Sequence, residues 1–403
     1  MISIDFNNEC CGCSACSQIC PQECIKMREN SEGFLIPQID FEKCVSCNLC
    51  EKVCPVLNSE TENLSDETIP KNVYAIYNKN EDIRLKSSSG GIFSLLAEYT
   101  IRKKGVVFGA KFSDDFKSVY HCMIEKEEDI ALFRGSKYIQ SNINNTYKEV
   151  RNQLEKGRFV LFSGTPCQVE GLRYFLRKEY DNLFLADLIC HGVPSPKVWR
   201  KYLEHIENKY DKPKTVLFRE KSNGWKGGGN VYITLQNNET HIDPLECNLY
   251  SSTFCQNLSL RNSCYECNFR KANRGSDVTI GDFWGIDSVA PELNDNKGIS
   301  AVIMHSPKAK RIFEELSDQI VYSQVDFKSI EKNNLILKQP DKHKNRNKFY
   351  EALDKVSFDK NVKKNIPRHS AFIKMSYKIV KVCLKKILGD KNFNKLKMRL
   401  KNI

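Results

Sequence analysis

The sequence lacks the features that mark secreted, membrane-spanning and common nucleotide-binding proteins. No stretch approaches ~18 uninterrupted apolar residues, so we expect no membrane-spanning helix. The opening MISIDFNNECC has neither a basic nor an apolar segment, which predicts no secretory signal. No GxGxxG follows an early strand and no GxxxxGK[ST] occurs, so the usual nicotinamide fold and a P-loop ATPase are poorly supported. We therefore expect a cytoplasmic protein whose thiols stay reduced.

Acidic residues are scarce at one end of the chain. Residues 368–403 contain eleven Lys or Arg and one acid, Asp390, and thus carry +10 of the net charge of +12. The rest is nearly neutral, so we expect no nucleic-acid partner. Residues 372–388 place apolar side chains on one helical face and lysines mainly elsewhere. Such a basic amphipathic helix suits either peripheral contact with an anionic (inner) membrane face or packing on the body or a partner.

Cysteine, in contrast, is abundant, with 18 residues. Two runs share the spacing CxxCxxCxxxCP, which is the bacterial ferredoxin arrangement for two 4Fe-4S clusters. In that arrangement the fourth ligand of each cluster comes from the other run. One cluster is then expected on Cys10, Cys13, Cys16 and Cys54, and the other on Cys44, Cys47, Cys50 and Cys20. Zinc is the alternative, but its sites usually pair two CxxC units without a third cysteine. Cys11 and Cys24 fall outside the pattern and are expected to be bystanders.

The pattern divides the chain into four parts. Residues 1–57 are expected to form an α+β, ferredoxin-like two-cluster module with a strand at 34–40. A polar, acidic linker at 58–72 follows. Strand and helix patterns then alternate over 73–345, which predicts an α/β body, and 346–403 is expected to be a basic helical tail. Because the chain continues far beyond the module, the module is expected to pass electrons to the body.

Two joints of the body combine small residues with a predicted helix start. The helix expected at 87–105 begins with SSSGG, and the strand at 158–164 leads into a helix through SGTPC. Free backbone N–H groups at such helix starts attract phosphate, although ordinary helix caps look the same. We also expect a hairpin across Asp114–Asp115 and a strand at 182–190. Four further cysteines stand near strand ends or in a CxxC pair: Cys167, Cys190, Cys264 and Cys267.

Five ordered stretches reveal a resemblance: SSSGGIFSLL, RGSKYIQS, SGTPCQVEGL, DLICHGVPS and CYECNFRKANRGSDVTIGDFWG. Together, from about residue 73 to about 345, they resemble the coenzyme F-420 hydrogenase/dehydrogenase beta-subunit family. The resemblance implies a flavin, usually FAD, with a third 4Fe-4S cluster beside it. It implies that Cys167, Cys190, Cys264 and Cys267 hold this cluster; the alternative is four core thiols.

The resemblance also implies a set of flavin-contacting residues in this chain: Ser89, Gly90, Gly91, Gly135, Ser136, Lys137, Gly164, Thr165, Pro166, Gly281 and Asp282. Lys137 would neutralise the flavin pyrophosphate or its reduced ring, or else be a surface lysine. His191 follows Cys190 and would be a catalytic proton donor, because histidine titrates near neutrality. Its alternatives are a hydrogen bond to a cluster sulfur or a turn cap.

We therefore expect an iron–sulfur flavoprotein oxidoreductase. Electrons would pass from a low-potential donor, such as a ferredoxin or a hydrogenase-type subunit, through the clusters to FAD and on to an acceptor. Some members of the resembled family occur with polysaccharide biosynthesis, which makes a sugar intermediate one candidate acceptor. The alternative is a non-catalytic electron-transfer subunit of a larger redox complex.

Overall fold

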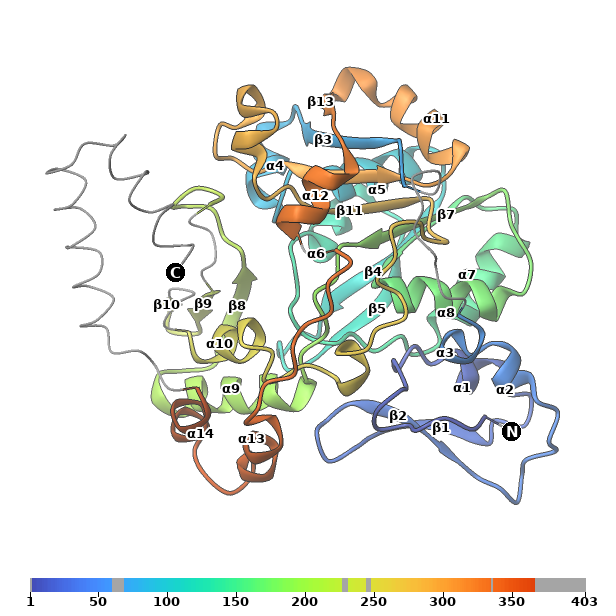
Figure 1. Ribbon diagram of the computed structural model, residues 1–403, viewed down its shortest axis with the longest axis vertical. Coiled ribbons are helices and arrows are strands. Elements are labelled where there is room, and N and C mark those ends of the chain that lie inside the picture. Colours follow the sequence, from blue (N-terminus) through green and yellow to red (C-terminus); the bar gives the residue numbers. More distant parts are fainter. Residues whose placement is uncertain (1, 60–68, 227–230, 244–247, 335, 367–403) are drawn as a thin grey trace, which may run out of the picture.

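The computed structural model describes residues 2–59, 69–226, 231–243, 248–334 and 336–366. Figure 1 shows an N-terminal module at one end of a large sheet-centred body, with a smaller sheet beside that body. The predicted amphipathic helix at 372–388, and with it the basic segment 368–403, lies outside the described residues. Most of the expected linker, residues 60–68, does so too.

The N-terminal module consists of a β-hairpin and three short helices. Its elements are β1 (Ile25–Glu29), β2 (Leu35–Ile39), α1 (Ala15–Ile19), α2 (Leu49–Lys52) and α3 (Pro55–Asn58). β1 and β2 pair antiparallel, and β2 confirms the strand predicted at 34–40. The two cysteine runs fold alike, since α1 and α2 each begin one residue before the third cysteine of their run. Ser14 and Asn48, which precede these helices, both adopt left-handed backbone conformations (φ 65° and 58°).

An eight-stranded mixed sheet forms the centre of the body. Its order is β13-β3-β12-β11-β7-β6-β4-β5. The strands are β3 (Val73–Asn78), β4 (Val106–Phe112), β5 (Val119–Ile124), β6 (Val160–Gly164), β7 (Leu183–Leu188), β11 (Val278–Asp282), β12 (Ser300–Met304) and β13 (Ile320–Gln324). β4, β6, β7 and β11 run parallel to one another, so their carboxyl ends meet at one edge of the sheet. Ligands of α/β sheets characteristically bind outside that edge.

Helices cover both faces of this sheet. One face carries α5 (Ile92–Arg102), α6 (Ile130–Phe133) and α11 (Pro307–Glu315). The other carries α7 (Thr146–Glu155), α8 (Pro166–Leu176) and α12 (Phe327–Asn334). The fully buried apolar run Val160–Phe162 explains the central place of β6, because a strand covered on both faces must be apolar on both. The α/β body predicted from the alternating pattern is thus confirmed.

Local sequence signals set the helix starts. α8 begins with a capping box, in which Thr165 and Gln168 satisfy each other's backbone donors, and with Pro166 in the first turn. The helix predicted at 87–105 starts later than expected, at Ile92. A separate short helix, α4 (Glu81–Lys86), precedes it, and Gly91 (φ 82°) makes the left-handed turn between them. The hairpin predicted across 114–115 is confirmed by the antiparallel pairing of β4 with β5.

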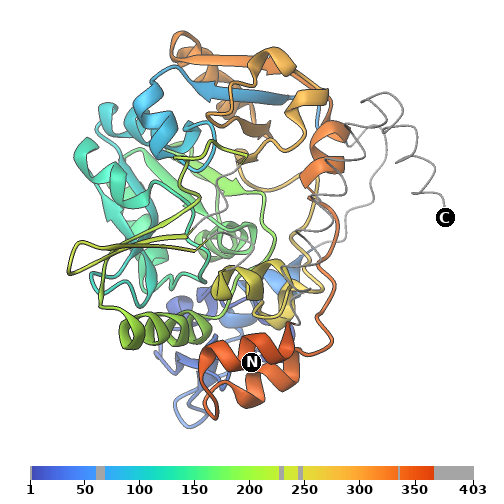
Figure 2. The same cartoon turned by 90° about the vertical axis from the view of Figure 1, so that its left-hand side faces the viewer.

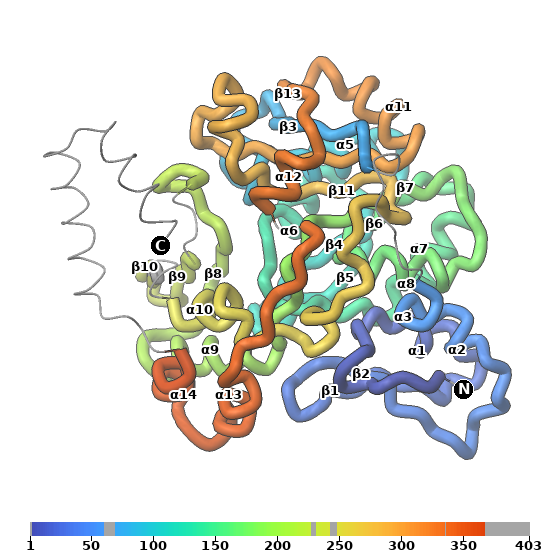
Figure 3. Tube along the Cα trace, in the orientation of Figure 1, coloured from blue at the N-terminus to red at the C-terminus, as the bar shows by residue number. Residues whose placement is uncertain are grey.

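A smaller sheet and four helices form a second layered unit. They are β8 (Pro213–Phe218), β9 (Val231–Leu235), β10 (Thr240–Asp243), α9 (Pro196–Lys209), α10 (Leu249–Cys255), α13 (Arg346–Ala352) and α14 (Phe358–Asn365). Figure 2 shows α13 and α14 beside α9, and Figure 3 shows the chain returning from α12 to reach them. Phe349 and Phe358 join the buried core of this unit, so residues 346–366, which we expected in the tail, pack on the body instead.

Five short 3-10 helices complete the described secondary structure: η1 (Glu127–Asp129), η2 (Asn262–Cys264), η3 (Ile286–Ser288), η4 (Pro291–Leu293) and η5 (Ser317–Gln319). Over the described ranges, none of the helices combines the length and the apolar character needed to cross a membrane.

Candidate functional site

The four cysteines expected to hold the first cluster lie near one another in the module. The thiols of Cys10, Cys13, Cys16 and Cys54 are all buried in the module. Burial raises the pKa of Cys16 well above its usual value, and charge on the nearby Cys10 and Cys54 would raise it further. The backbone N–H of Gly12 donates to Cys10 Sγ at 3.3 Å. Four such thiols become stable thiolates only beside a strong positive charge, which an iron–sulfur cluster supplies.

The second set lies at the surface of the module. Cys20, Cys44, Cys47 and Cys50 line one cavity. Cys47 is exposed, and Phe41 and Val45 nearby in the chain are 69 % and 62 % exposed. The loop holds Ser46 and Asn48 in left-handed conformations, which turn the backbone around the cavity. Cys24, expected to be a bystander, also lines the cavity, and its sulfur lies 3.3 Å from that of Cys20.

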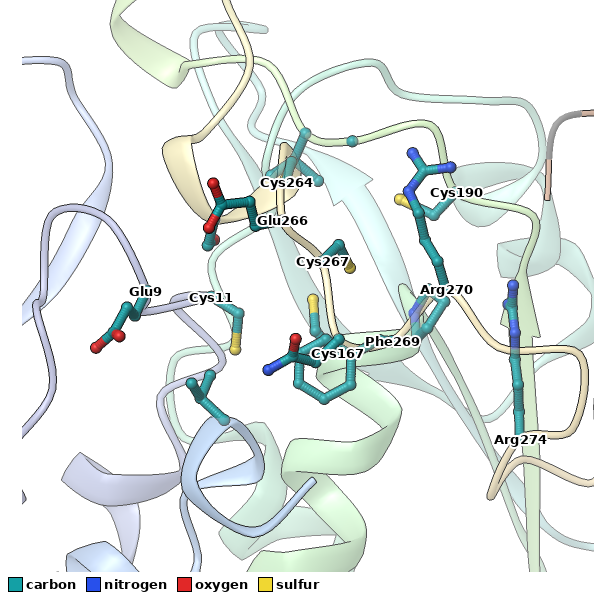
Figure 4. A pocket seen from close by; sticks show the side chains of 16 residues that line it. Glu9, Cys11, Cys167, Cys190, Cys264, Glu266, Cys267, Phe269, Arg270 and Arg274 are labelled. Atoms are coloured by element: carbon teal, nitrogen blue, oxygen red, sulfur yellow. The ribbon is translucent and has the colours of Figure 1, made fainter. Parts of the chain in front are cut away.

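The four body cysteines line a separate cavity between the sheet edge and the module. Cys167 lies in the first turn of α8 directly after β6, and Cys190 follows β7, so both stand at carboxyl ends of adjacent parallel strands. Cys264 and Cys267 enter from the loop after α10. Figure 4 shows the side chains of Cys167 and Cys267 pointing toward one another across the cavity. The strand-end position predicted for Cys167 and Cys190 is thus confirmed, and all four cysteines line one cavity.

The electrostatics of this cavity favour soft-metal ligation. Burial raises the pKa of Cys190 to about 12, and charge on Cys167 and Cys267 would raise it further. The guanidinium of Arg270 opposes that effect, because it attracts the thiolate. Arg270 is held by its hydrogen bond to the backbone oxygen of His191 at 2.6 Å. Four thiols that line one cavity suit an iron–sulfur cluster. Across the described ranges, no three His, Cys, Asp or Glu side chains form a ready site for a single metal ion.

Buried polar contacts fix the module against the body. Arg261, 2 % exposed, donates to the backbone oxygens of Cys10 (2.6 Å) and Leu35 (3.0 Å) and to Gln140 Oε1 (3.0 Å). Gln140 in turn donates to the backbone oxygen of Cys11 at 3.1 Å. A second buried guanidinium, that of Arg346, makes a bidentate pair with Glu32 (Nη1–Oε1 2.7 Å, Nη2–Oε2 2.6 Å). These contacts set the position of the first cysteine set relative to the body cavity.

The loop predicted to contact flavin lies at the same sheet edge, across β12. Ser89 Oγ donates to the backbone oxygens of Ile299 (2.7 Å) and Gly281 (3.3 Å). Gly90 must be glycine, because a Cβ would lie 2.5 Å from the Ile76 carbonyl oxygen. Ser136 meets this loop, since its backbone N–H and hydroxyl both donate to Ser88 Oγ, at 2.7 and 3.0 Å. The structure thus brings residues 88–91, 135–136 and 281 together.

Asp282 is held among aromatic and cationic side chains. Its Oδ1 accepts from Trp225 Nε1 at 2.9 Å and lies 3.5 Å from Arg219 Nη2. The Trp225 and Trp284 rings stack with centroids 4.8 Å apart, and the Arg219 guanidinium lies over Trp284. Burial raises the pKa of the nearby Tyr138, and charge on Arg219 and Asp282 also influences that pKa. Asp282 and its aromatic neighbours therefore lie beside residues 88–91, because Ser89 donates to the carbonyl of the preceding Gly281.

Gly164, Thr165, Pro166 and Lys137 have different surroundings. Thr165 caps α8, its hydroxyl oxygen lies 3.2 Å from Cys167 Sγ, and Pro166 lines the cysteine cavity, so this segment belongs to the thiol site. Lys137 Nζ donates to three backbone oxygens at the end of α6: those of residues 133, 134 and 135. Burial lowers the pKa of Lys137 to about 7. Lys137 is therefore not a free surface lysine, and its amino group contacts these backbone oxygens instead of being available to a phosphate.

His191 connects the two parts of the edge. Its ring packs edge-on against Phe254, with centroids 5.2 Å apart, and Phe254 packs against Tyr138 at 4.9 Å. Nε2 lies 2.7 Å from Asn257 Oδ1, so this nitrogen carries the proton and donates it. Burial lowers the pKa of His191, which favours the neutral ring at pH 7. The row from Cys190 through His191 and Phe254 thus ends at Tyr138, two residues from Ser136, which contacts Ser88.

Comparison with protein families identifies two parts of the chain. Residues 9–58 match the family model "4Fe-4S dicluster domain". Residues 157–330 match the model of the C terminus of the coenzyme F420 hydrogenase/dehydrogenase beta subunit. Residues 9–58 are thus similar to a 4Fe-4S dicluster domain, and residues 157–330 are similar to the C terminus of that beta subunit. The chain is an iron–sulfur redox protein, and the resemblance stated from the sequence motifs is confirmed.

One solved structure is similar to the F420 beta-subunit-like chain over a large part of its length. It is a chain of the F420-reducing [NiFe] hydrogenase complex from Methanosarcina barkeri, determined after xenon derivatization. The two are 16 % identical, with a TM-score of 0.46, and the match covers 75 % of this chain and 94 % of that one. No curated protein sequence matches the chain.

Sequence reasoning missed several residues around the beta-subunit domain and its dicluster partner. Cys11 breaks the ligand spacing and therefore looked like a bystander, although the doubled cysteine was a visible signal. Arg219 and Trp225 had no recognisable motif. Arg261 stands three residues before the CxxC pair, but nothing in a single sequence shows that an arginine will be buried across a domain boundary.

Proposed function

We propose that the chain is an iron–sulfur flavoprotein oxidoreductase, in which three 4Fe-4S clusters link a low-potential electron donor to FAD. The observation that carries this proposal is the convergence of Cys167, Cys190, Cys264 and Cys267. They come from three separate segments of the body, yet they line one cavity directly against the dicluster module. Four unrelated core thiols would not be expected to line a single cavity between the module and the sheet edge.

The surroundings of that cavity support a cluster of negative overall charge. Arg270 and Arg274 line it, and Arg274 is fixed by a buried ion pair with Asp187 (3.1 Å) and by its bond to the Leu188 carbonyl (3.0 Å). Guanidinium groups stay charged at any physiological pH, so they stabilise thiolate ligands. The residues of the second cavity and the crossed set in the module fit the two remaining clusters.

The edge residues fit a flavin in part. Within the described part of the chain, two buried donors near residues 88–91 and 281–282 have no hydrogen-bond partner: Asn78 Nδ2 and Arg219 Nε. Gly135 (φ 85°) has open space where a side chain would lie. Buried donors without partners are rare and indicate a missing ligand or water. Residues 88–91, 135–136, Arg219 and Asp282 would hold the cofactor. A bound flavin supplies the coupling of one-electron to two-electron transfer.

The alternative is an electron-transfer subunit of a larger complex. The family description "beta subunit" and the apolar exposed surface around Cys47, formed by Phe41 and Val45, favour this second function. Turnover by the isolated chain with a small acceptor, a polysaccharide precursor among those tried, would support the enzyme. Reduction of the chain without turnover, together with co-purification of a redox partner, would support the subunit.

The test of cofactor content is anaerobic purification with iron, acid-labile sulfide and flavin measured per chain. The proposal expects about twelve irons, four for each cubic cluster, and one flavin. About eight irons with flavin would remove the third cluster and leave Cys167, Cys190, Cys264 and Cys267 as core thiols. About eight irons without flavin, even after reconstitution, would overturn the flavoprotein proposal.

A further inference from the structure

Cys11 lies between two of the cysteine sets. Its side chain is buried, and it lines the body cavity together with Cys167 and the other three body cysteines. It reaches that cavity from the module, as the left-hand side of Figure 4 shows. Its own neighbours in the sequence, Cys10 and Cys13, belong to the first set. Cys11 is therefore the module's thiol at the body cavity.

The contacts of Cys11 extend to both sides. Its side chain packs in one core with that of Cys13 on the module side, and it lines one cavity with that of Cys167 on the body side. The same apolar core contains Cys11, Cys13, Cys167 and Cys267. The body thiols also influence one another, because charge on Cys267, Cys190 or Cys167 would raise the pKa of Cys264. Cys11 is thus a fifth thiol at the edge of the four body cysteines that the proposed function takes as ligands.

The backbone around Cys11 is fixed by body residues. Gln140 Nε2 donates to its carbonyl at 3.1 Å, and Arg261 Nε donates to the preceding carbonyl at 2.6 Å. Gly12 follows with φ 71°, and a Cβ there would lie 2.7 Å from Arg261 Nη1. Only glycine allows this close approach. The position of the Cys11 thiol is thus set by both domains.

We propose that Cys11 binds no iron but keeps its S–H, which donates a hydrogen bond to the cluster-ligating sulfur of Cys13 or Cys167. Cys11 is then the positioning residue that joins the first and the third cluster. This inference rests on the proposed function, because it takes both sets as ligated. Hydrogen bonds to ligating sulfur stabilise the more negative, reduced cluster and so raise its reduction potential.

The test compares Cys11→Ala with Cys11→Ser in the full-length, anaerobically purified protein. Serine keeps a donor of similar size, whereas alanine removes it. Cys24→Ala is the matched control, because Cys24 is equally a buried extra thiol of the module but contacts Cys20 of the second set, at 3.3 Å. The readouts are iron per chain, electron paramagnetic resonance spectra of the reduced clusters, and a redox titration followed by the same signals.

We expect unchanged iron in Cys11→Ala and a lower potential of the first or third cluster. At a fixed applied potential near the midpoint, its reduced-to-oxidised ratio should fall about tenfold, as the loss of a hydrogen bond to a charged group implies. Cys11→Ser should retain most of the wild-type ratio, and Cys24→Ala should alter only the second cluster. Loss of about four irons in Cys11→Ala would make Cys11 a ligand and overturn the proposal.

Unchanged potentials and spectra in Cys11→Ala would also overturn the proposal, while a wild-type content of about twelve irons would leave the proposed function standing. A wild-type content of about eight irons would instead remove the third cluster. These two failures are therefore separable by the iron content of the unmodified protein.

Discussion

The second and the third cysteine set differ in how the fold encloses them. The second set needs only the module: all its cysteines lie in the two runs, and Cys47 is exposed on a loop flanked by Phe41 and Val45. The third set lies where two parts of the chain meet, because the segments that follow β6, β7 and α10 supply its thiols and Cys11 of the module lines the same cavity. A site with an exposed cysteine suits exchange with another protein, and a site between the module and the body suits transfer within the chain.

The difference shows that the third set, unlike the second, depends on the interface between the module and the body. The module could hold its two clusters by itself, since the first and second sets lie within residues 10–54. The third set depends on the sheet edge for its thiols and on Arg261 for its boundary with the module. Substitutions should therefore affect the two sites independently, with effects that range from loss of a cluster to a few-fold change in reduction rate.

The sharpest separation should come from the double substitution Cys264→Ala/Cys267→Ala. It removes two of four ligands from the third set, and two thiolates cannot hold a cubic cluster. We expect about one third of the iron to be lost, with the electron paramagnetic resonance signals of the module clusters retained. Cys255→Ala, on an exposed cysteine, is the control and should lose none. Iron content identical to wild type in the double variant would contradict the third cluster.

A second separation targets the interface. Arg261→Ala removes a buried guanidinium that donates to Cys10 O, Leu35 O and Gln140, and it leaves buried carbonyls without donors. We expect the free energy of unfolding to fall by about 3 kcal/mol. Anaerobic denaturant titration measures this loss.

Arg200→Ala is the matched control for Arg261→Ala. Arg200 also crosses from body to module, in a bidentate pair with Glu29 at 3.0 and 2.6 Å, but both partners are partly exposed. Such a surface pair contributes about 1 kcal/mol or less. Equal losses from the two variants would show that burial of Arg261 does not matter.

Much of this comparison could be read from the sequence, but not the part that depends on distant residues. The regular spacing of the two runs predicts their crossed sets, because three of the four ligands of each cluster lie within one run. The apolar runs and small-residue joints predicted that Cys167 and Cys190 stand at strand ends. The role of Lys137 could not be predicted, because it depends on three carbonyls that the end of α6 presents. The burial of Cys11 at the body cavity depends on Arg261 and Gln140, which lie far along the chain.

The boundary of the tail shows the same limit. Residues 346–366 are rich in lysine, so their composition predicted a continuation of the basic tail. Their few apolar side chains, among them Phe349 and Phe358, are however buried against the second unit. Composition measures the average of a segment, whereas packing depends on a few positions on one helical face.

A third separation uses thiol chemistry in protein stripped of iron. Burial raises the pKa of Cys190 to about 12, so near pH 8 this side chain is almost entirely thiol and reacts slowly with an alkylating agent. Its reaction should accelerate as pH rises toward that pKa, because the thiolate fraction grows. Cys47 is exposed and should react at least about tenfold faster at pH 8. Mass spectrometry of cysteine peptides over time measures both rates, and equal rates would contradict the enclosure of the third set.

The smallest effect should come from the surface beside the second set. Phe41 is 69 % exposed, so Phe41→Ser should change the free energy of unfolding by less than about 0.5 kcal/mol. If electrons reach the chain here, the variant should slow reduction by a ferredoxin-type donor a few-fold, since it removes apolar contact area from a small docking surface. Leu132→Ser is the control, because Leu132 is an exposed apolar residue of the body, on α6. Stopped-flow reduction at two donor concentrations distinguishes a defect in docking from a defect in electron transfer. A docking defect disappears when the donor is saturating. Equal reduction rates for the two variants would show that the donor binds elsewhere.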